Sequence, residues 1–206
     1  MKEQKIVSAG KKIEEAGKVL ILLHGRGAYA EDILSLAENF SLDQFAVLAP
    51  QAHGHTWYPY SFLVPVAQNE PFLSDAIQVI DRIVQDVLRK GIPENKIYFA
   101  GFSQGACLTL EYATRKAKRW GGVIAFTGGL IGAHIDTSHY QGNFEGTPVF
   151  IGTSDPDPHV PVVRVNESAE VLKAMGAKVL VKVYRNMGHT INQEEVELAD
   201  KILTSS

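Results

Sequence analysis

Residues 97–105 place a short apolar run directly before the pentapeptide Gly-Phe-Ser-Gln-Gly at 101–105. The run is typical of a buried strand, and the stretch after the pentapeptide is typical of a helix. The turn that joins them is so tight that the positions two before and two after Ser103 must nearly lack side chains, and both are glycine. We therefore expect Ser103 to hold a strained backbone conformation, with its hydroxyl exposed at the N-terminus of the helix, where the dipole favours negative charge.

Strand and helix patterns alternate along the rest of the chain. Further apolar runs predict strands at 19–23, 45–49, 122–126, 149–153 and 179–184. Because these runs are apolar on both sides, they favour a mostly parallel central sheet with helices on both faces. Helical spacing is clearest at 73–90, which ends at Gly91, and further helices are expected at about 31–39, 104–118, 162–175 and 193–203. We expect one α/β domain that spans residues 1–206.

Charge and cysteine content narrow the class of protein. A net charge of −3 argues against nucleic acid or an anionic membrane as the main partner. The polar start of the chain predicts no signal peptide, and no apolar run is long enough for stable membrane insertion. The single cysteine, Cys107, cannot form an intrachain disulfide, which fits a cytoplasmic protein, and we expect its side chain to be buried.

Polar residues follow the predicted strands where the carboxyl ends of a parallel sheet meet. These residues are His24, Ser103, the pair Asp155 and Asp157, and His189. A serine hydroxyl needs a base within hydrogen-bond reach, and the base needs a carboxylate that orients it. His189 is the best candidate base, and the chain order Ser, Asp, His is typical of α/β-hydrolases.

Other histidines fit this chemistry less well. His24 precedes a glycine loop and is expected to organise that loop by hydrogen bonds. His53 and His55 form an H-x-H pair, but no further metal-ligand motif accompanies them, so we predict no metal site.

The chain resembles the phospholipase/carboxylesterase family of α/β-hydrolases, which includes acyl-protein thioesterases and small bacterial carboxylesterases. The resemblance spans nearly the whole length, from Leu-Leu-His-Gly-x-Gly at 22–27 through Gly-Phe-Ser-Gln-Gly at 101–105 to Gly-His at 188–189. It implies the α/β-hydrolase fold. Family members carry an Asp-Pro-x-Val-Pro segment that supplies the carboxylate, and residues 157–161 match it, which favours Asp157. Spacing from the preceding glycine would instead point to Asp155.

An oxyanion hole is expected beside the nucleophile, because the tetrahedral intermediate carries a negative charge that needs preorganised donors. One donor should be the backbone N–H of Gln104, directly after Ser103. The resemblance places the second donor at the backbone of Arg26, where relatives commonly carry an apolar residue. Two interpretations of the Arg26 side chain stay open: it favours acidic substrates, or it simply faces solvent.

The loop at 51–71 is the expected source of specificity. It carries Trp57, Tyr58, Phe62 and Leu63, and the corresponding segment of the family borders the substrate pocket. Alternatively, these side chains fill a small core within the loop. A proline at position 59 departs from the family's pattern, so the named substrates of relatives do not transfer.

Together these features predict a serine hydrolase of carboxylic esters or thioesters that works through an acyl-enzyme, with a small-molecule ester as substrate and no metal or organic cofactor. The resemblance also implies a homodimer, although no segment of the sequence points to an interface. Alternatives are a lysophospholipase or acyl-protein thioesterase, a dienelactone-hydrolase-like enzyme, which would carry cysteine as nucleophile, and a non-catalytic ligand-binding protein.

Overall fold

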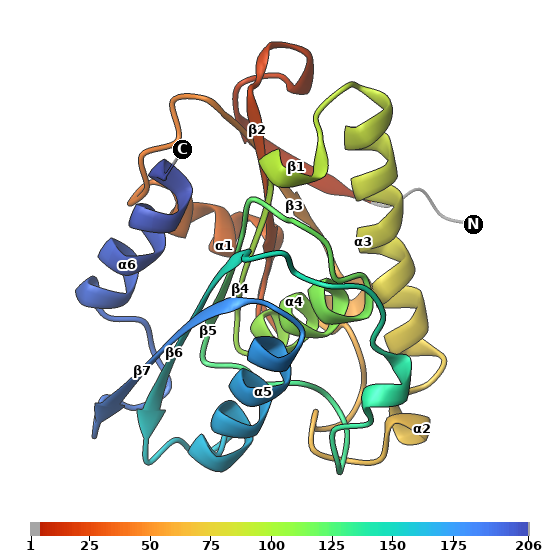
Figure 1. Cartoon of the computed structure of the whole chain (residues 1–206), viewed down its shortest axis with the longest axis vertical. Coiled ribbons are helices and arrows are strands. Elements are labelled where there is room, and N and C mark those ends of the chain that lie inside the picture. Colours follow the sequence, from red (N-terminus) through yellow and green to blue (C-terminus); the bar gives the residue numbers. More distant parts are fainter. Residues whose placement is uncertain (1–4, 206) are drawn as a thin grey trace.

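A computed structural model describes residues 5–205 of the chain. Within them, seven strands form one sheet in the order β1-β3-β2-β4-β5-β6-β7 (Figure 1). The strands are β1 Ile6–Gly10, β2 Lys18–Leu23, β3 Phe45–Pro50, β4 Ile97–Phe102, β5 Gly122–Phe126, β6 Pro148–Asp155 and β7 Lys178–Arg185. Strand β1 pairs antiparallel with β3, and the other neighbouring pairs are parallel. The mostly parallel sheet is therefore confirmed.

Helices follow most of the parallel strands along the chain. They are α1 Ala30–Ala37, α2 Val66–Asn69, α3 Phe72–Arg89, α4 Gln104–Arg115, α5 Val162–Ala174 and α6 Gln193–Thr204. Short 3-10 turns lie at Ile13–Glu15, His53–His55, Glu94–Lys96 and Thr137–His139. None of the helices in residues 5–205 is long and apolar enough to cross a membrane.

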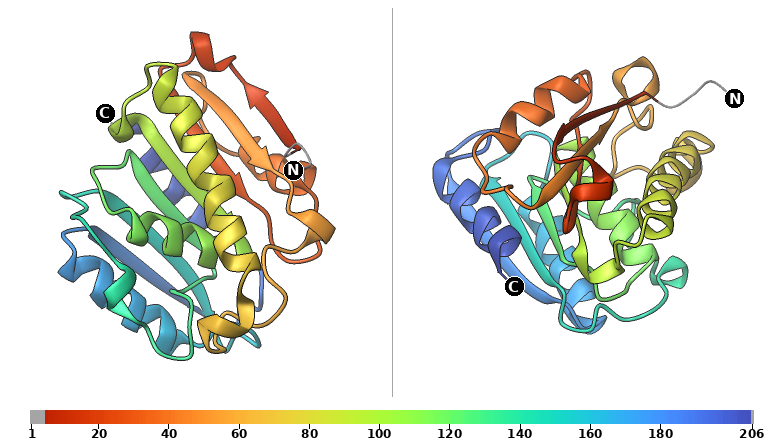
Figure 2. Two further views of the ribbon diagram at one scale, coloured as in Figure 1. Left: turned by 90° about the vertical axis from the view of Figure 1, so that its right-hand side faces the viewer. Right: turned by 90° about the horizontal axis from the view of Figure 1, so that it is seen from above.

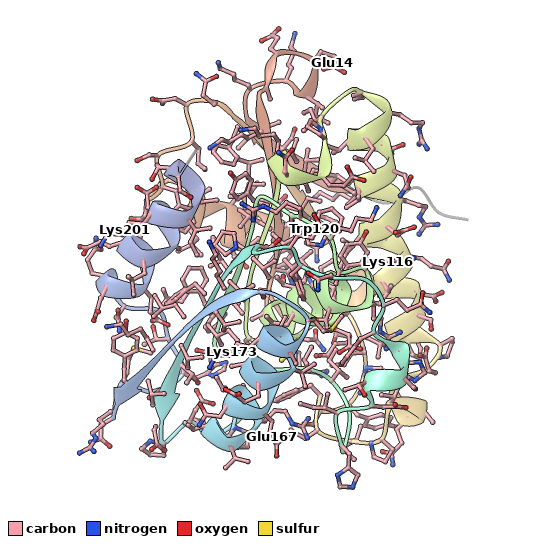
Figure 3. The ribbon with its side chains drawn as sticks, viewed as in Figure 1. Glu14, Lys116, Trp120, Glu167, Lys173 and Lys201 are labelled. Carbon is pink, nitrogen blue, oxygen red and sulfur yellow. The ribbon has the colours of Figure 1, made fainter. Side chains whose placement is uncertain are left out.

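The helices cover both faces of the sheet, as expected. Figures 1 and 2 show α3, α4 and α5 on one face and α1 and α6 on the other. Successive residues of a strand point to opposite faces, so Phe99 belongs to the core under α3, α4 and α5, whereas Tyr98 belongs to the core under α1 and α6. Trp120, labelled in Figure 3, lies in the interior and packs edge-on against Phe99 at 5.0 Å between ring centroids.

Two elements lie outside the sequence predictions. Strand β1 shows no apolar alternation because it is an edge strand, largely exposed, whose partner is β3 alone. Helix α2 has four residues and lies in the loop at 51–71, and it is too short to give a periodic pattern.

Helix α4 was predicted, but it ends at Arg115 rather than near 118, since the Ala117 N–H donates to the Gln141 carbonyl outside the helix.

Candidate active site

Ser103 lies in the turn between β4 and α4. Its backbone has φ 55° and ψ −117°, a conformation that side-chain-bearing residues rarely adopt. The Ser103 N–H donates to the Phe126 carbonyl of β5 at 2.9 Å, and the Ser103 carbonyl accepts from the Cys107 N–H at 3.0 Å. The neighbouring strand and the helix therefore hold the strained turn on both sides.

His189 lies between Ser103 and Asp157, and it joins them by hydrogen bonds. Its Nε2 is 2.9 Å from Ser103 Oγ, and its Nδ1 is 2.8 Å from Asp157 Oδ2. Each side chain comes from a loop at the carboxyl end of a different strand, namely β4, β6 and β7. With Asp157 ionised, Nδ1 carries the proton and Nε2 is free to accept the Ser103 hydroxyl proton.

The Asp157 carboxylate is buried and held in place by three donors. Its Oδ1 accepts the backbone N–H groups of His159 and Val160, each at 2.8 Å, while Oδ2 faces the His189 ring. Burial alone would raise the pKa of Asp157, but these hydrogen bonds outweigh it and hold the pKa below its ordinary value. Asp155 instead ends β6 with an exposed side chain, so the structure brings Asp157 and not Asp155 to His189.

His24 organises the first glycine loop, as predicted. It is completely buried, and its Nε2 accepts the Ala52 N–H at 3.0 Å. The ring proton must therefore sit on Nδ1, which donates to the Gly25 carbonyl at 2.7 Å. Burial lowers the pKa of His24, which favours the neutral ring. The Trp57 indole N–H donates to the His24 carbonyl at 2.9 Å and ties this loop to the segment after β3.

The residues predicted to supply the oxyanion donors, Arg26 and Gln104, belong to two segments next to Ser103. Gln104 is the first residue of α4, where backbone N–H groups have no partner within the helix. Gly25 precedes Arg26, and a Cβ at Gly25 would be in ordinary van der Waals contact with the Ser103 Cβ at 3.6 Å, so this loop lies next to the serine. The Gln104 side chain is also engaged: its Oε1 accepts the Trp57 N–H at 2.9 Å.

Arg26 is exposed, and its guanidinium also holds the loop that follows the 3-10 turn at His53–His55. Its Nη1 donates to the Pro59 carbonyl at 2.8 Å and to Thr56 Oγ1 at 3.1 Å, and its Nη2 donates to the Tyr60 carbonyl at 2.7 Å. It also lies 6.0 Å from the centroid of the Tyr58 ring. The exposure of Arg26 agrees with the interpretation of a solvent-facing side chain, but neither interpretation from the sequence included the role as a clamp on the loop.

A cavity of about 800 Å³ opens beside Ser103 and His189. Its lining comes from the glycine loop, the segment at 58–63, the start of α4 and the segment after β6. Tyr58, Phe62 and Leu63 line it, as expected, but Trp57 does not: its indole is buried against His24, with ring centroids 5.0 Å apart. The segment at 51–71 thus both borders the cavity and fills a core of its own.

The lining also includes His159, Phe102 and Cys107, which were not predicted from the sequence as site residues. The His159 ring packs edge-on against His189 at 4.9 Å between centroids, and Phe102 packs at 5.1 Å. Cys107 is buried as expected, but it also borders the cavity, one helical turn after Ser103. The Asp-Pro-x-Val-Pro match was the one signal that could have pointed to His159, which occupies its variable position.

Residues 5–205 contain no cluster of three or more His, Cys, Asp or Glu side chains placed to hold a metal ion. Neither His53 nor His55 belongs to the hydrogen-bonded set of Ser103, His189 and Asp157. His55 Nδ1 lies 3.2 Å from the Ala28 carbonyl, and the His55 carbonyl accepts the Gly27 N–H at 2.7 Å.

Glu195 is a further buried carboxyl, and it follows the loop that carries His189. It forms a capping box at the start of α6, where Glu195 Oε2 accepts the Asn192 N–H and Asn192 Oδ1 accepts the Glu195 N–H, both at 2.9 Å. Its Oε1 is buried without a hydrogen-bond partner among the described residues. Burial raises the pKa of Glu195 to about 7.

We expect Glu195→Gln to remove a pH-dependent loss of stability. The folded protein keeps the Glu195 proton up to about pH 7, whereas the unfolded chain releases it near 4.5, so the free energy of unfolding falls as pH rises between these values. At about 1.4 kcal/mol for each pH unit, the loss is at most about 3 kcal/mol. Urea unfolding at pH 5 to 8 should show that the free energy of unfolding of the variant increases relative to that of the wild type as pH rises. The exposed Glu197→Gln on the same helix is the control, and a curve for Glu195→Gln that runs parallel to that of the wild type would contradict the assignment.

Comparison with known proteins shows the family. A profile of the phospholipase/carboxylesterase family matches residues 2–206. The chain is 49% identical to a phospholipase/carboxylesterase of Dyadobacter fermentans of known crystal structure, with a TM-score of 0.96 over 98% of this chain and 97% of that one. It is 27% identical over 214 residues to acyl-protein thioesterase 1 of Saccharomyces cerevisiae, covering 90% of this chain and 91% of the yeast protein. The Bacillus cereus carboxylesterase shares the fold at 22% identity, with a TM-score of 0.76 over 97% of this chain and 93% of that one.

The chain therefore belongs to the phospholipase/carboxylesterase family of α/β-hydrolases, and the resemblance noted from the sequence is confirmed. It is a hydrolase with the α/β-hydrolase fold.

Proposed function

We propose that this protein cleaves carboxylic esters, and thioesters by the same route, with Ser103 as the nucleophile and an acyl-enzyme as the intermediate. The observation that carries the proposal is the unbroken hydrogen-bonded chain from Ser103 Oγ through the His189 ring to the buried Asp157 carboxylate. It lies against a cavity large enough for a small ester.

In the proposed mechanism, His189 Nε2 takes the Ser103 hydroxyl proton as Oγ bonds to the carbonyl carbon of the substrate. The carbonyl oxygen becomes an oxyanion, which accepts hydrogen bonds from the backbone N–H groups of Gln104 and Arg26. His189 then gives its proton to the leaving oxygen or sulfur, the bond to that atom breaks, and the acyl group stays on Ser103. A water molecule then attacks the acyl carbon while His189 Nε2 takes its proton. His189 returns this proton to Ser103 Oγ as the acyl bond breaks, and the carboxylic acid is released. Asp157 stays ionised and stabilises the charged His189 ring.

Relatives suggest a second candidate for the leaving group. Several similar proteins are named acyl-protein thioesterase 1, and thioester cleavage needs no change to the catalytic residues because only the leaving atom differs. A lysophospholipase would likewise share the chemistry and differ in the chain length that the cavity takes. The cavity holds Tyr60, Ser61 and His159 beside its apolar residues, which favours small esters over long acyl chains.

Hydrolysis of p-nitrophenyl esters from acetyl to palmitoyl tests the proposal. We expect the highest kcat/KM with short acyl groups, because the cavity is partly polar, and loss of turnover in Ser103→Ala. An optimum at palmitoyl would favour the lysophospholipase or thioesterase, and no turnover of any ester or thioester would favour a ligand-binding protein.

Asp157→Asn should lower kcat by about 10⁴-fold, because an asparagine amide stabilises the wrong tautomer of His189. Asp155→Asn is the matched control two residues away, with an exposed side chain, and should keep kcat within about twofold of the wild type. Both rates are measured with p-nitrophenyl acetate at pH 7.5. The reverse order of the two variants would assign the carboxylate to Asp155.

Arg26→Met should lower kcat/KM by roughly 3- to 30-fold, since the lost hydrogen bonds loosen the cavity wall at 56–60 while the backbone N–H remains. Arg26→Lys separates the clamp from the charge, because lysine keeps the charge but not the planar fork. A lysine variant as slow as the methionine variant supports the clamp. A lysine variant as fast as the wild type, with a preference for acidic esters, would support charge recognition instead.

The cellular setting is also part of the proposal. A thiol at Cys107 with no partner cysteine in the sequence fits the cytoplasm. We propose that residues 1–206 act as one domain and that the protein forms a homodimer. Light scattering of the purified protein measures the assembly directly.

A further inference from the structure

Strands β6 and β7 lead into the two loops that carry Asp157 and His189. The strands pair in parallel up to Asp155 and Arg185, the last pair of the ladder. Asp157 follows the end of β6 by two residues, and His189 follows the end of β7 by four. The ladder therefore reaches neither of these side chains, and contacts beyond the sheet set the distance between the two loops.

The Ser154 hydroxyl joins these two loops. Ser154 is completely buried and is the last residue but one of β6. Its Oγ accepts the N–H of Gly188, the residue before His189, at 3.0 Å. The same Oγ donates to the carbonyl of Pro156, the residue before Asp157, at 3.3 Å. One side chain thus contacts the backbone beside the proposed base and the backbone beside the carboxylate that orients it.

The backbone directly before His189 has little packing to hold it. Gly188 has φ 81°, in the left-handed region, and a Cβ there would meet no atom of the described residues within 4 Å, its chain neighbours aside. A glycine in such open space has several backbone conformations within reach, and packing does not choose among them. The hydrogen bond to Ser154 Oγ favours the one in which His189 Nδ1 lies 2.8 Å from Asp157 Oδ2.

Other contacts hold different parts of this loop. The Asn186 N–H donates to the carbonyl of the last residue of β6 at 3.0 Å. The Phe102 and His159 rings pack against the His189 ring. These contacts fix the start of the loop and the imidazole itself, whereas the Ser154 hydroxyl holds the backbone between them.

We propose that Ser154 is a positioning residue for catalysis, whose hydroxyl sets the spacing of the two loops and thereby aligns His189 Nδ1 with the Asp157 carboxylate. This inference rests on the proposed function. Ser154 acts through the other two residues and not on the substrate, because its hydroxyl is buried and bonds to backbone groups. A misplacement of about 1 Å among reacting groups lowers a rate by about 10²-fold, so the loss of this link should act on kcat.

Ser154→Ala tests the inference, because it removes the hydroxyl and leaves the rest of the side chain. We expect kcat and kcat/KM for p-nitrophenyl acetate to fall together by about 10- to 100-fold, since His189 acts in both acylation and deacylation. Thr153→Val is the matched control on the neighbouring residue. It also removes a buried hydroxyl from β6, but Thr153 Oγ1 has no hydrogen-bond partner among the described residues, so this variant should keep the kcat of the wild type.

Thermal unfolding and proton NMR separate alignment from stability. The unfolding midpoint of Ser154→Ala should fall by less than about 10 °C, so the assays compare folded proteins. A proton shared between a histidine nitrogen and a carboxylate resonates far downfield, and Asp157→Asn identifies the signal of the His189 Nδ1 proton by removing it. We expect this signal to shift or broaden in Ser154→Ala and to stay unchanged in Thr153→Val.

A folded Ser154→Ala variant with either the kcat of the wild type or an unchanged downfield signal would overturn the inference and leave the proposed function standing. An equal loss of kcat in Thr153→Val would also overturn it, because the loss would then follow from removing any hydroxyl of β6. No turnover of any ester by the wild type would overturn the inference and the proposed function together.

Discussion

Ser103→Ala is expected to lower kcat for p-nitrophenyl esters by about 10⁵- to 10⁶-fold, the loss typical when the nucleophile of such a hydrogen-bonded set is removed. Without the Ser103 oxygen no acyl-enzyme forms, so the His189 ring has no hydroxyl proton to accept. The cavity and the proposed oxyanion donors remain, which leaves only the modest acceleration that binding and charge stabilisation provide.

The variant is compared with the wild type by burst kinetics and by covalent labelling with a fluorophosphonate. We expect a burst and a single labelled residue in the wild type, and neither in Ser103→Ala. Ser35→Ala on α1, which removes an exposed hydroxyl bonded to the Asp32 carbonyl, is the control and should behave as the wild type. Persisting turnover or labelling in Ser103→Ala would mean that another residue is the nucleophile.

Gly105→Ala is expected to destabilise the fold by at least about 4 kcal/mol, a value at the extreme of single substitutions. A Cβ at position 105 would lie 2.0 Å from the Leu23 carbonyl oxygen and 2.6 Å from the His24 carbonyl oxygen. Both are backbone atoms at the end of β2, in the centre of the sheet, so they cannot move aside as a flexible side chain could. Helix α4 would have to separate from β2.

Differential scanning calorimetry measures this effect as a fall in the unfolding midpoint of roughly 10 °C or more, or as failure to obtain folded protein. Gly17→Ala is the matched control, because the nearest atom to a Cβ there is the end of the Gln44 side chain at 3.9 Å. A midpoint for Gly105→Ala within about 2 °C of the control would show that the contact between α4 and β2 is looser than described.

The tight turn at 101–105 could be predicted from the sequence because its constraint is local. A tight turn between strand and helix excludes side chains at Gly101 and Gly105 wherever the sheet lies, and the structure shows a Cβ at Gly101 colliding with the Gly105 carbonyl at 2.4 Å. The parallel strands could be predicted equally well, because a strand that is buried on both faces has a continuous apolar run in its sequence. Strand β1 was not predicted, because an edge strand that is exposed to solvent carries no such run.

Sequence alone therefore determined the fold class, the family, and Ser103 and His189 as candidates, since each depends on short-range patterns. Tertiary structure decided what depends on distances between distant loops: which of Asp155 and Asp157 meets His189, that the Arg26 guanidinium clamps the loop at 56–60, and that Trp57 turns away from the cavity. Spacing along a chain does not determine where a flexible loop directs a side chain. Direction is set by the hydrogen bonds and packing that the loop finds in the folded protein.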